Sequence, residues 1–71
     1  MEDRDTTSFT WGMFKKGTYL TISFEGFSNQ EYIVMRTRRD KDESTIEFDT
    51  FRTKSLSKAN EMFSAWVMRE L

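Results

Sequence analysis

Acidic side chains come nearest to a catalytic arrangement in this chain of 71 residues. Glu47 and Asp49 stand two positions apart in an alternating segment, so they share one face of a strand, where two carboxylates could divide acid and base roles. Two acids at alternate positions are more often simply solvated, and Arg36 is expected opposite Glu47 as an ordinary ion pair. The chain has no histidine and no cysteine, the side chains that most often carry catalysis at neutral pH. We therefore predict that the protein is not an enzyme.

The segment Asp40-x-Asp42-x-Ser44 has part of the spacing of a calcium-binding loop. Such a loop needs a glycine at its sixth position and a bidentate glutamate at its twelfth, where this chain has Thr45 and Phe51. A hairpin loop is the better interpretation. A glycine-rich phosphate cradle is also missing, because the three glycines are isolated from one another. They are Gly12, Gly17 and Gly26. We predict neither a metal site nor a cofactor.

Arginines beside aromatic residues form the most suggestive charge feature of the sequence. Arg36 and Arg38 stand in the same segment as Tyr32, and Phe51 lies in the next one. Aromatic rings with interleaved arginines often hold single-stranded nucleic acid, because bases stack on the rings and guanidinium groups meet phosphates. Nearby carboxylates would repel phosphate, and 11 basic against 12 acidic residues give a net charge of −1. A solvated hairpin surface is therefore favoured over a nucleic-acid site.

The pattern of apolar residues predicts about four β-strands followed by one helix. The expected elements are strands at Phe9 to Met13, Tyr19 to Glu25, Glu31 to Arg38 and Thr45 to Arg52, and a helix at Ser55 to Leu71. The helix has an apolar stripe that should pack on one face of the sheet. The stripe consists of Leu56, Ala59, Phe63, Trp66 and Val67. The predicted fold is α+β, a small antiparallel meander with one C-terminal helix packed on one face.

The turn of the first hairpin decides which side chains face the helix. If Lys16 and Gly17 form a two-residue turn, with positive φ at the glycine, Met13 lies opposite Leu20 and Trp11 opposite Ile22. A three-residue loop would turn Trp11 outward instead, because a shift of one residue exchanges the two faces of a strand.

In the second hairpin, we expect the charged loop to lie symmetrically between its two strands. Met35 then pairs with Phe48 on the face that the helix covers. The opposite face would hold two further pairs, Arg36 with Glu47 and Tyr32 with Phe51. An ion pair and an aromatic pair both favour this register.

Length and composition limit the protein to one domain near the lower size for an unaided core. No disulfide can form without cysteine. Residues 1–8 are predicted to be a flexible acidic tail and residues 9–71 a single α+β domain. The N-terminus has no apolar signal region, and the longest apolar runs are four residues. We therefore predict a cytoplasmic protein with no membrane partner.

One helix cannot cover both faces of such a sheet, so one face should be open and available to a partner. The partner-binding residues predicted on this face are Phe14, Tyr19, Tyr32, Val34, Arg36, Arg38 and Phe51. A chain this short that begins at Met1 and lacks catalytic groups is expected to act by occupying a surface on a larger protein, or on a second copy of itself. Small regulators and inhibitors encoded by phages and mobile elements have this general profile.

The alternative is a single-stranded nucleic-acid-binding protein that uses the aromatic and arginine residues of the sheet. Four strands followed by one helix is similar to the element order of Whirly and PUR-type single-strand binders, a resemblance of topology that no residue motif accompanies. A structural subunit of a larger assembly is a third hypothesis.

Overall fold

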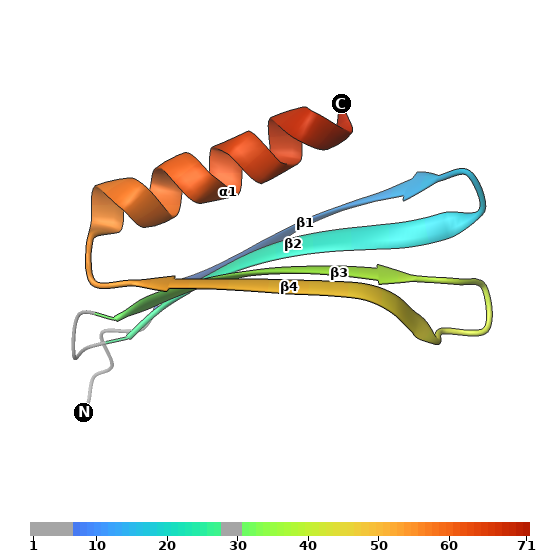
Figure 1. The fold of residues 1–71 in the computed structure, drawn as a ribbon, viewed down its shortest axis with the longest axis horizontal. Coiled ribbons are helices and arrows are strands. Elements are labelled where there is room, and N and C mark those ends of the chain that lie inside the picture. The colour runs from blue at the N-terminus through green and yellow to red at the C-terminus, as the bar shows by residue number, and fades with distance from the viewer. Residues whose placement is uncertain (1–6, 28–30) are drawn as a thin grey trace.

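The described residues of this computed structural model, 7–27 and 31–71, form a four-stranded antiparallel sheet and one helix (Figure 1). The elements are β1 (Thr7–Lys15), β2 (Thr18–Gly26), β3 (Tyr32–Arg39), β4 (Thr45–Thr53) and α1 (Leu56–Glu70). The strands lie in sequential order, and α1 packs on one face of the sheet. The predicted α+β meander with a C-terminal helix is confirmed.

The first strand begins earlier than expected. Thr7 and Ser8, which were assigned to the acidic tail, pair with Gly26 and Glu25 as the start of β1. The rest of the predicted tail, residues 1–6, lies outside the described residues, as do residues 28–30 of the loop between β2 and β3.

The first hairpin has the predicted two-residue turn. Lys16 and Gly17 have φ values of 53° and 80°, and the positive φ at both positions matches the right-handed twist of the flanking strands. Met13 therefore lies opposite Leu20, and Trp11 opposite Ile22. All of these pairings were predicted from the turn.

The predicted register of the second hairpin was wrong by two residues. Met35 pairs with Thr50 rather than Phe48, and Arg36 lies directly opposite Asp49. The loop is asymmetric because the ladder is irregular between Arg38 and Arg39. Within the loop, the Asp40 carboxylate accepts hydrogen bonds from the backbone of residues 42 and 44, at 2.9 and 3.0 Å. The loop pairs Arg39 rather than Arg38 with Thr45, an offset of one residue, and the irregularity shifts the pairing of every residue beyond it by one more.

Strand β2 determines which face of β3 meets the helix. Val34 pairs with Phe24, and Arg36 pairs with Ile22, whose side chains belong to the core beneath α1. Directly paired residues share a face. The helix face of the sheet therefore carries the even-numbered positions of β3, which were predicted to face outward.

The core lies between α1 and the centre of the sheet. Its buried members are Leu20, Ile22, Phe24, Val34 and Ala59. Aromatic rings extend the core toward β1, since Phe9 stacks on Phe24 at 4.9 Å and meets Phe63 edge-on at 5.0 Å. The helix begins where Ser55 caps it, with the hydroxyl accepting a hydrogen bond from the Lys58 backbone at 3.2 Å.

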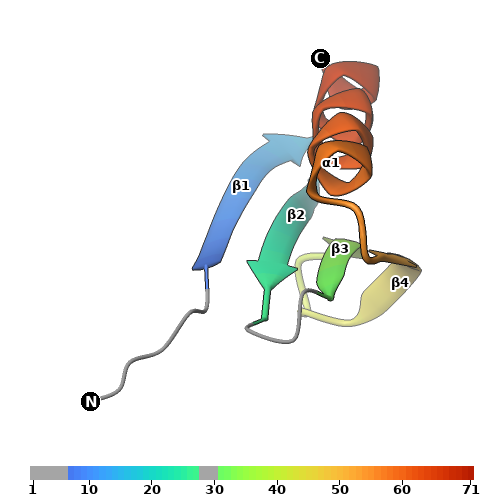
Figure 2. The ribbon, with the colours of Figure 1, turned by 90° about the vertical axis from the view of Figure 1, so that its left-hand side faces the viewer.

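The predicted stripe of α1 is correct except at its first position. Leu56 is 51% exposed, whereas Met62, which is not one of the five residues of the predicted stripe, packs against the core. Figure 2 shows α1 above β2 and β3, with β1 to one side of it.

A mild truncation in the core should destabilise the fold more than the same truncation at an exposed position of the sheet. Ile22 is fully buried and Ile46 is 51% exposed on β4. Ile22→Val is expected to lower the free energy of unfolding by about 1 kcal/mol, because it removes a buried methyl group. Ile46→Val, the matched control, should change it by less than about 0.5 kcal/mol. Urea unfolding of both variants measures the difference, and equal effects would contradict the assignment of the core.

Candidate functional site

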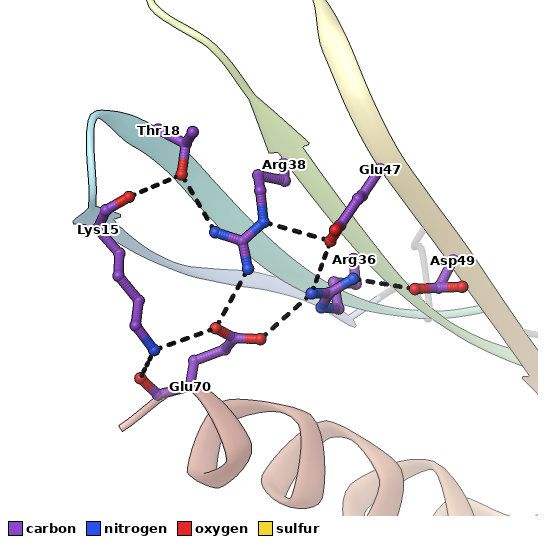
Figure 3. A network of polar contacts seen from close by, with 7 residues as sticks. All are labelled: Lys15, Thr18, Arg36, Arg38, Glu47, Asp49 and Glu70. Carbon is purple, nitrogen blue, oxygen red and sulfur yellow. Dashed lines mark hydrogen bonds and ion pairs between the residues drawn. The ribbon is translucent and has the colours of Figure 1, made fainter.

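A network of polar and charged side chains lies between the C-terminal end of α1 and the sheet (Figure 3). We name it the arginine cluster. It consists of Lys15, Thr18, Arg36, Arg38, Glu47, Asp49 and Glu70. The residues come from all four strands and the helix, so the cluster joins segments that are distant in the sequence.

Arg36 and Arg38 hold the centre of the cluster. The Arg36 guanidinium donates to Asp49 at 3.0 Å, to Glu47 at 2.9 Å and to Glu70 at 3.2 Å. Arg38 donates to Glu47 at 3.2 Å and to Glu70 at 3.3 Å, and its third contact is the Thr18 hydroxyl at 3.1 Å. Each guanidinium is therefore directed at several acceptors of the same molecule.

Glu70 anchors the end of the helix to the sheet. Its side chain is only 7% exposed, and besides the two arginines it meets Lys15, whose ammonium lies 3.6 Å from the carboxylate. The same ammonium donates to the Glu70 backbone carbonyl at 3.0 Å, one of the acceptors that a helix leaves unpaired at its C-terminus. A buried carboxylate without partners is strongly destabilising, and here three cations compensate it.

The electrostatics of the cluster favour the ionised forms of Glu47 and Glu70. Hydrogen bonds from Arg38 and then Arg36 lower the pKa of Glu47 below its ordinary value of 4.5. Burial alone would raise the pKa of Glu70, but the hydrogen bonds and charges of Arg36 and Arg38 outweigh it, and the pKa is lowered. Burial likewise opposes the charge of Arg36, yet Glu47 and Glu70 raise its pKa. These pKa directions favour a set of fixed charges rather than a group that exchanges protons at neutral pH.

One polar atom of the cluster is not compensated. Arg36 Nε is buried and has no hydrogen-bond partner among the described residues. An unpaired buried donor costs about 1–3 kcal/mol, so the cluster is not optimised for stability alone.

Five of the seven predicted partner-binding residues lie on the helix face rather than the open face. They are Tyr32, Val34, Arg36, Arg38 and Phe51. Tyr32, Val34 and Phe51 pack in or against the core, while the two arginines belong to the arginine cluster. The predicted location was wrong because the alternation of β3 allows either set of residues to face the helix, and only the pairing with β2 decides between them.

The open face is the side of the sheet opposite α1, which no described element covers. Phe14 and Tyr19 lie there as predicted, with ring centroids 4.8 Å apart. Phe14 is 79% exposed. The Tyr19 ring also lies over Gly12, where an added Cβ would approach the tyrosine hydroxyl to 2.5 Å. This glycine therefore lets the aromatic pair lie close against β1.

The sequence-based prediction missed the apolar residues on the other half of the open face. They are Ile33 and Met35 on β3 and Phe48 on β4. Phe48 is 58% exposed and pairs with Thr37, which in turn pairs with Thr21 of β2. The open face thus presents aliphatic and aromatic side chains among threonines. The sequence contained a signal for them. Leu20, Ile22 and Phe24 of β2 form the core, and the pairing of β3 with β2 determines which residues of β3 lie on the same face.

Charges are sparse on the open face and of both signs. The charged residues whose pairing places them on this face are Glu25, Arg39 and Arg52. Arg52 also lies 3.6 Å from Glu31. This face therefore lacks the continuous positive charge that follows a phosphate backbone.

Within residues 7–27 and 31–71, no group of three or more acidic, histidine or cysteine side chains could hold a metal ion. The same part of the chain has no helix long and apolar enough to cross a membrane. Comparisons with protein-family models, with curated proteins and with solved structures find no match to this chain.

The arginine cluster predicts a specific acid sensitivity. A carboxylate whose pKa is lower in the folded than in the unfolded protein stabilises the fold above the unfolded value, and this stabilisation is lost as the pH falls through the folded value. For Glu70 and Glu47, the loss should begin near pH 4.5 and continue below it. Glu70→Gln should lower the free energy of unfolding by roughly 2 kcal/mol at pH 7 and reduce its decline in acid.

Urea unfolding between pH 3 and pH 7, a range chosen about the ordinary carboxylate pKa, measures this difference. Glu61→Gln is the matched control, since Glu61 is an exposed carboxylate of the same helix. It should retain the pH dependence of the unmodified protein. A Glu70→Gln variant with the same stability at pH 7 as the control would show that the cluster does not hold the helix.

Proposed function

We propose that the protein is a non-enzymatic interaction module that binds a larger protein through its open face, and that it acts as a small cytoplasmic regulator or inhibitor by covering a surface of that partner. The observation that carries this proposal is the set of apolar side chains exposed on a face that no described element covers. Apolar surfaces of this kind commonly mark protein interaction sites.

The composition of the open face supports a protein partner. Phe14 and Phe48 are 79% and 58% exposed, and they lie at opposite sides of the face, on β1 and β4. Aromatic residues and methionine are enriched at the cores of protein interfaces, whereas charged residues are depleted there. Met35 on β3, a diagonal neighbour of Phe48, adds a flexible side chain of the same kind.

The position of the arginines weakens the case for single-stranded nucleic acid. Binding to a phosphate backbone requires cations beside the stacking rings. Arg36 and Arg38, which were expected to provide them, have 11% and 17% of their side chains exposed and contact internal carboxylates. The aromatic residues that remain on the open face therefore lie among few cations, an environment that favours a protein surface.

Truncation of an exposed ring on the open face should weaken partner binding without unfolding the domain. Phe14→Ala and Phe48→Ala are each expected to reduce retention of a specific partner at least about tenfold, the effect of an interface residue worth ~1.4 kcal/mol. Affinity capture from cells that encode this chain, with quantitative mass spectrometry, identifies the partner as the protein whose recovery falls in both variants.

Met68→Ala serves as the control, because Met68 is 69% exposed on α1, away from the open face. It should retain the partner fully. Equal recovery of every captured protein with Phe14→Ala, Phe48→Ala and the unmodified chain would contradict the proposal. A labelled oligonucleotide that binds the unmodified chain, with an affinity that falls steeply as salt rises, would favour the nucleic-acid alternative instead.

A further inference from the structure

The two edge strands of the sheet differ in how well they are protected from pairing with another strand. An edge strand presents unpaired backbone N–H and C=O groups, and proteins usually protect such edges with charges, proline or bulges. Strand β1 is one edge and pairs with β2 alone among the described strands. Between Ser8 and Phe14 it has no charged residue and no proline, and its nine residues pair with β2 without a register shift.

The opposite edge has the protection that β1 lacks. Strand β4 carries Glu47, Asp49 and Arg52, and the ladder that joins it to β3 is irregular between Arg38 and Arg39. Glu47 and Asp49 have 50% and 56% of their side chains exposed. A strand that approached this edge would meet two acidic side chains at successive positions of one face.

The helix also leaves the apolar side chains of β1 incompletely covered. Its main contacts are with β2, β3 and β4, and Figure 2 shows β1 to the side of α1, with no other described element beyond its outer edge. Phe9 is 44% exposed, and Trp11 and Met13 are only partly buried. The strand therefore has apolar surface as well as backbone groups that are free to be covered.

We infer that β1 is a self-association edge, at which β1 of a second copy adds antiparallel to form one eight-stranded sheet. A twofold axis at Trp11, the midpoint of Thr7–Lys15, lets the whole strand pair. Trp11 then lies opposite its own counterpart, and Phe9 lies opposite Met13 of the second copy. All of these are apolar side chains on the helix face, and cross-strand pairs of this kind stabilise a sheet.

The charges of the two strands select β1 over β4 as the self-association edge. If β4 paired with β4 of a second copy about a twofold axis at its midpoint, Asp49 would lie opposite the Asp49 of the second copy. Directly opposed like charges are destabilising, whereas the midpoint of β1 is uncharged. Lys15, the one charged residue of β1, lies at its end and contacts Glu70 within its own chain.

The pairing places the two copies of Thr10 close together on the open face. Thr10 lies opposite Gly12 of the second copy, so the two Thr10 residues are diagonal neighbours, a relation that separates the residues by roughly 7–8 Å and their Cβ atoms by somewhat less. Thr10 is exposed and contributes nothing to the core, so substitutions there should leave the monomer folded. Long side chains of opposite charge could reach one another across the axis.

A charge-exchange experiment at Thr10 tests the pairing. Light scattering after gel filtration should give twice the 8.5 kDa of one chain for the unmodified protein. Thr10→Lys and Thr10→Glu should each weaken the dimer by about two- to fivefold, because like charges then lie diagonally across the twofold axis. An equimolar mixture of the two variants should recover a dimer. Thr50→Lys is the matched control, since Thr50 is an exposed threonine on the open face of β4, and it should remain dimeric.

A monomeric unmodified protein at every concentration up to the millimolar range would overturn the inference. So would a dissociation constant of the dimer that both Thr10 substitutions leave unchanged, a mixture of the two variants that binds no more tightly than either variant alone, or a dimer weakened equally by Thr50→Lys. Phe48→Ala should dimerise normally while it loses the partner of the open face. The self-association edge and the proposed function can therefore fail independently.

Discussion

The structure depends on a mismatch in size between helix and sheet. A helix of 15 residues is about 22 Å long at 1.5 Å per residue, whereas strands of nine residues extend about 30 Å at 3.3 Å per residue. The helix therefore covers only part of one face, from the end of the sheet where β4 ends, and it stops short of the two hairpin turns (Figure 1). A single helix of this length leaves the opposite face open, β1 partly covered and a polar region under its own C-terminal end.

The arginine cluster occupies the region where the helix and the sheet diverge. Arg36 and Arg38 lie there beside Glu70, the last residue of the helix, and 11% and 17% of their side chains are exposed. Charged side chains tolerate partial hydration, and their long aliphatic stems cover apolar surface while the guanidinium groups reach carboxylates. Replacing such a cluster with apolar residues is neutral or stabilising in some buried sites, but at a partly hydrated margin it would enlarge the exposed apolar surface. The cluster thus closes one end of the core and joins the last turn of the helix to the sheet.

Sequence reasoning predicted the strands, the helix and the first hairpin because each depends on local signals. Gly17 determined the turn, and the turn determined the pairing of Trp11 and Met13. The second hairpin was mispaired because nothing local in the Asp40 loop indicates an irregular ladder. The faces of β3 were exchanged because both alternate sets contain apolar residues, so hydrophobicity alone could not orient the strand.

A signal for the correct orientation was present in the helix. Glu70 lies three positions after Val67 and seven after Phe63, so it falls on the same helical stripe. A carboxylate on the buried stripe needs a cation opposite it, and β3 contains two arginines at alternate positions. This argument would have turned Arg36 and Arg38 toward the helix, and with them Val34. The open face would then have been assigned Ile33, Met35 and Phe48.

The two surfaces proposed here use different parts of the sheet and are compatible. Strand pairing at the edge of β1 uses backbone hydrogen bonds in the plane of the sheet, whereas a partner on the open face contacts side chains perpendicular to that plane. Addition of a second β1 would extend the open face across the twofold axis rather than cover it. A protein of this size presents a limited surface for binding, and a larger interface allows more apolar contacts to be buried together. Self-association through β1 would therefore give the open face a doubled, symmetric area, which suits a partner that is itself twofold symmetric or carries two copies of the same epitope.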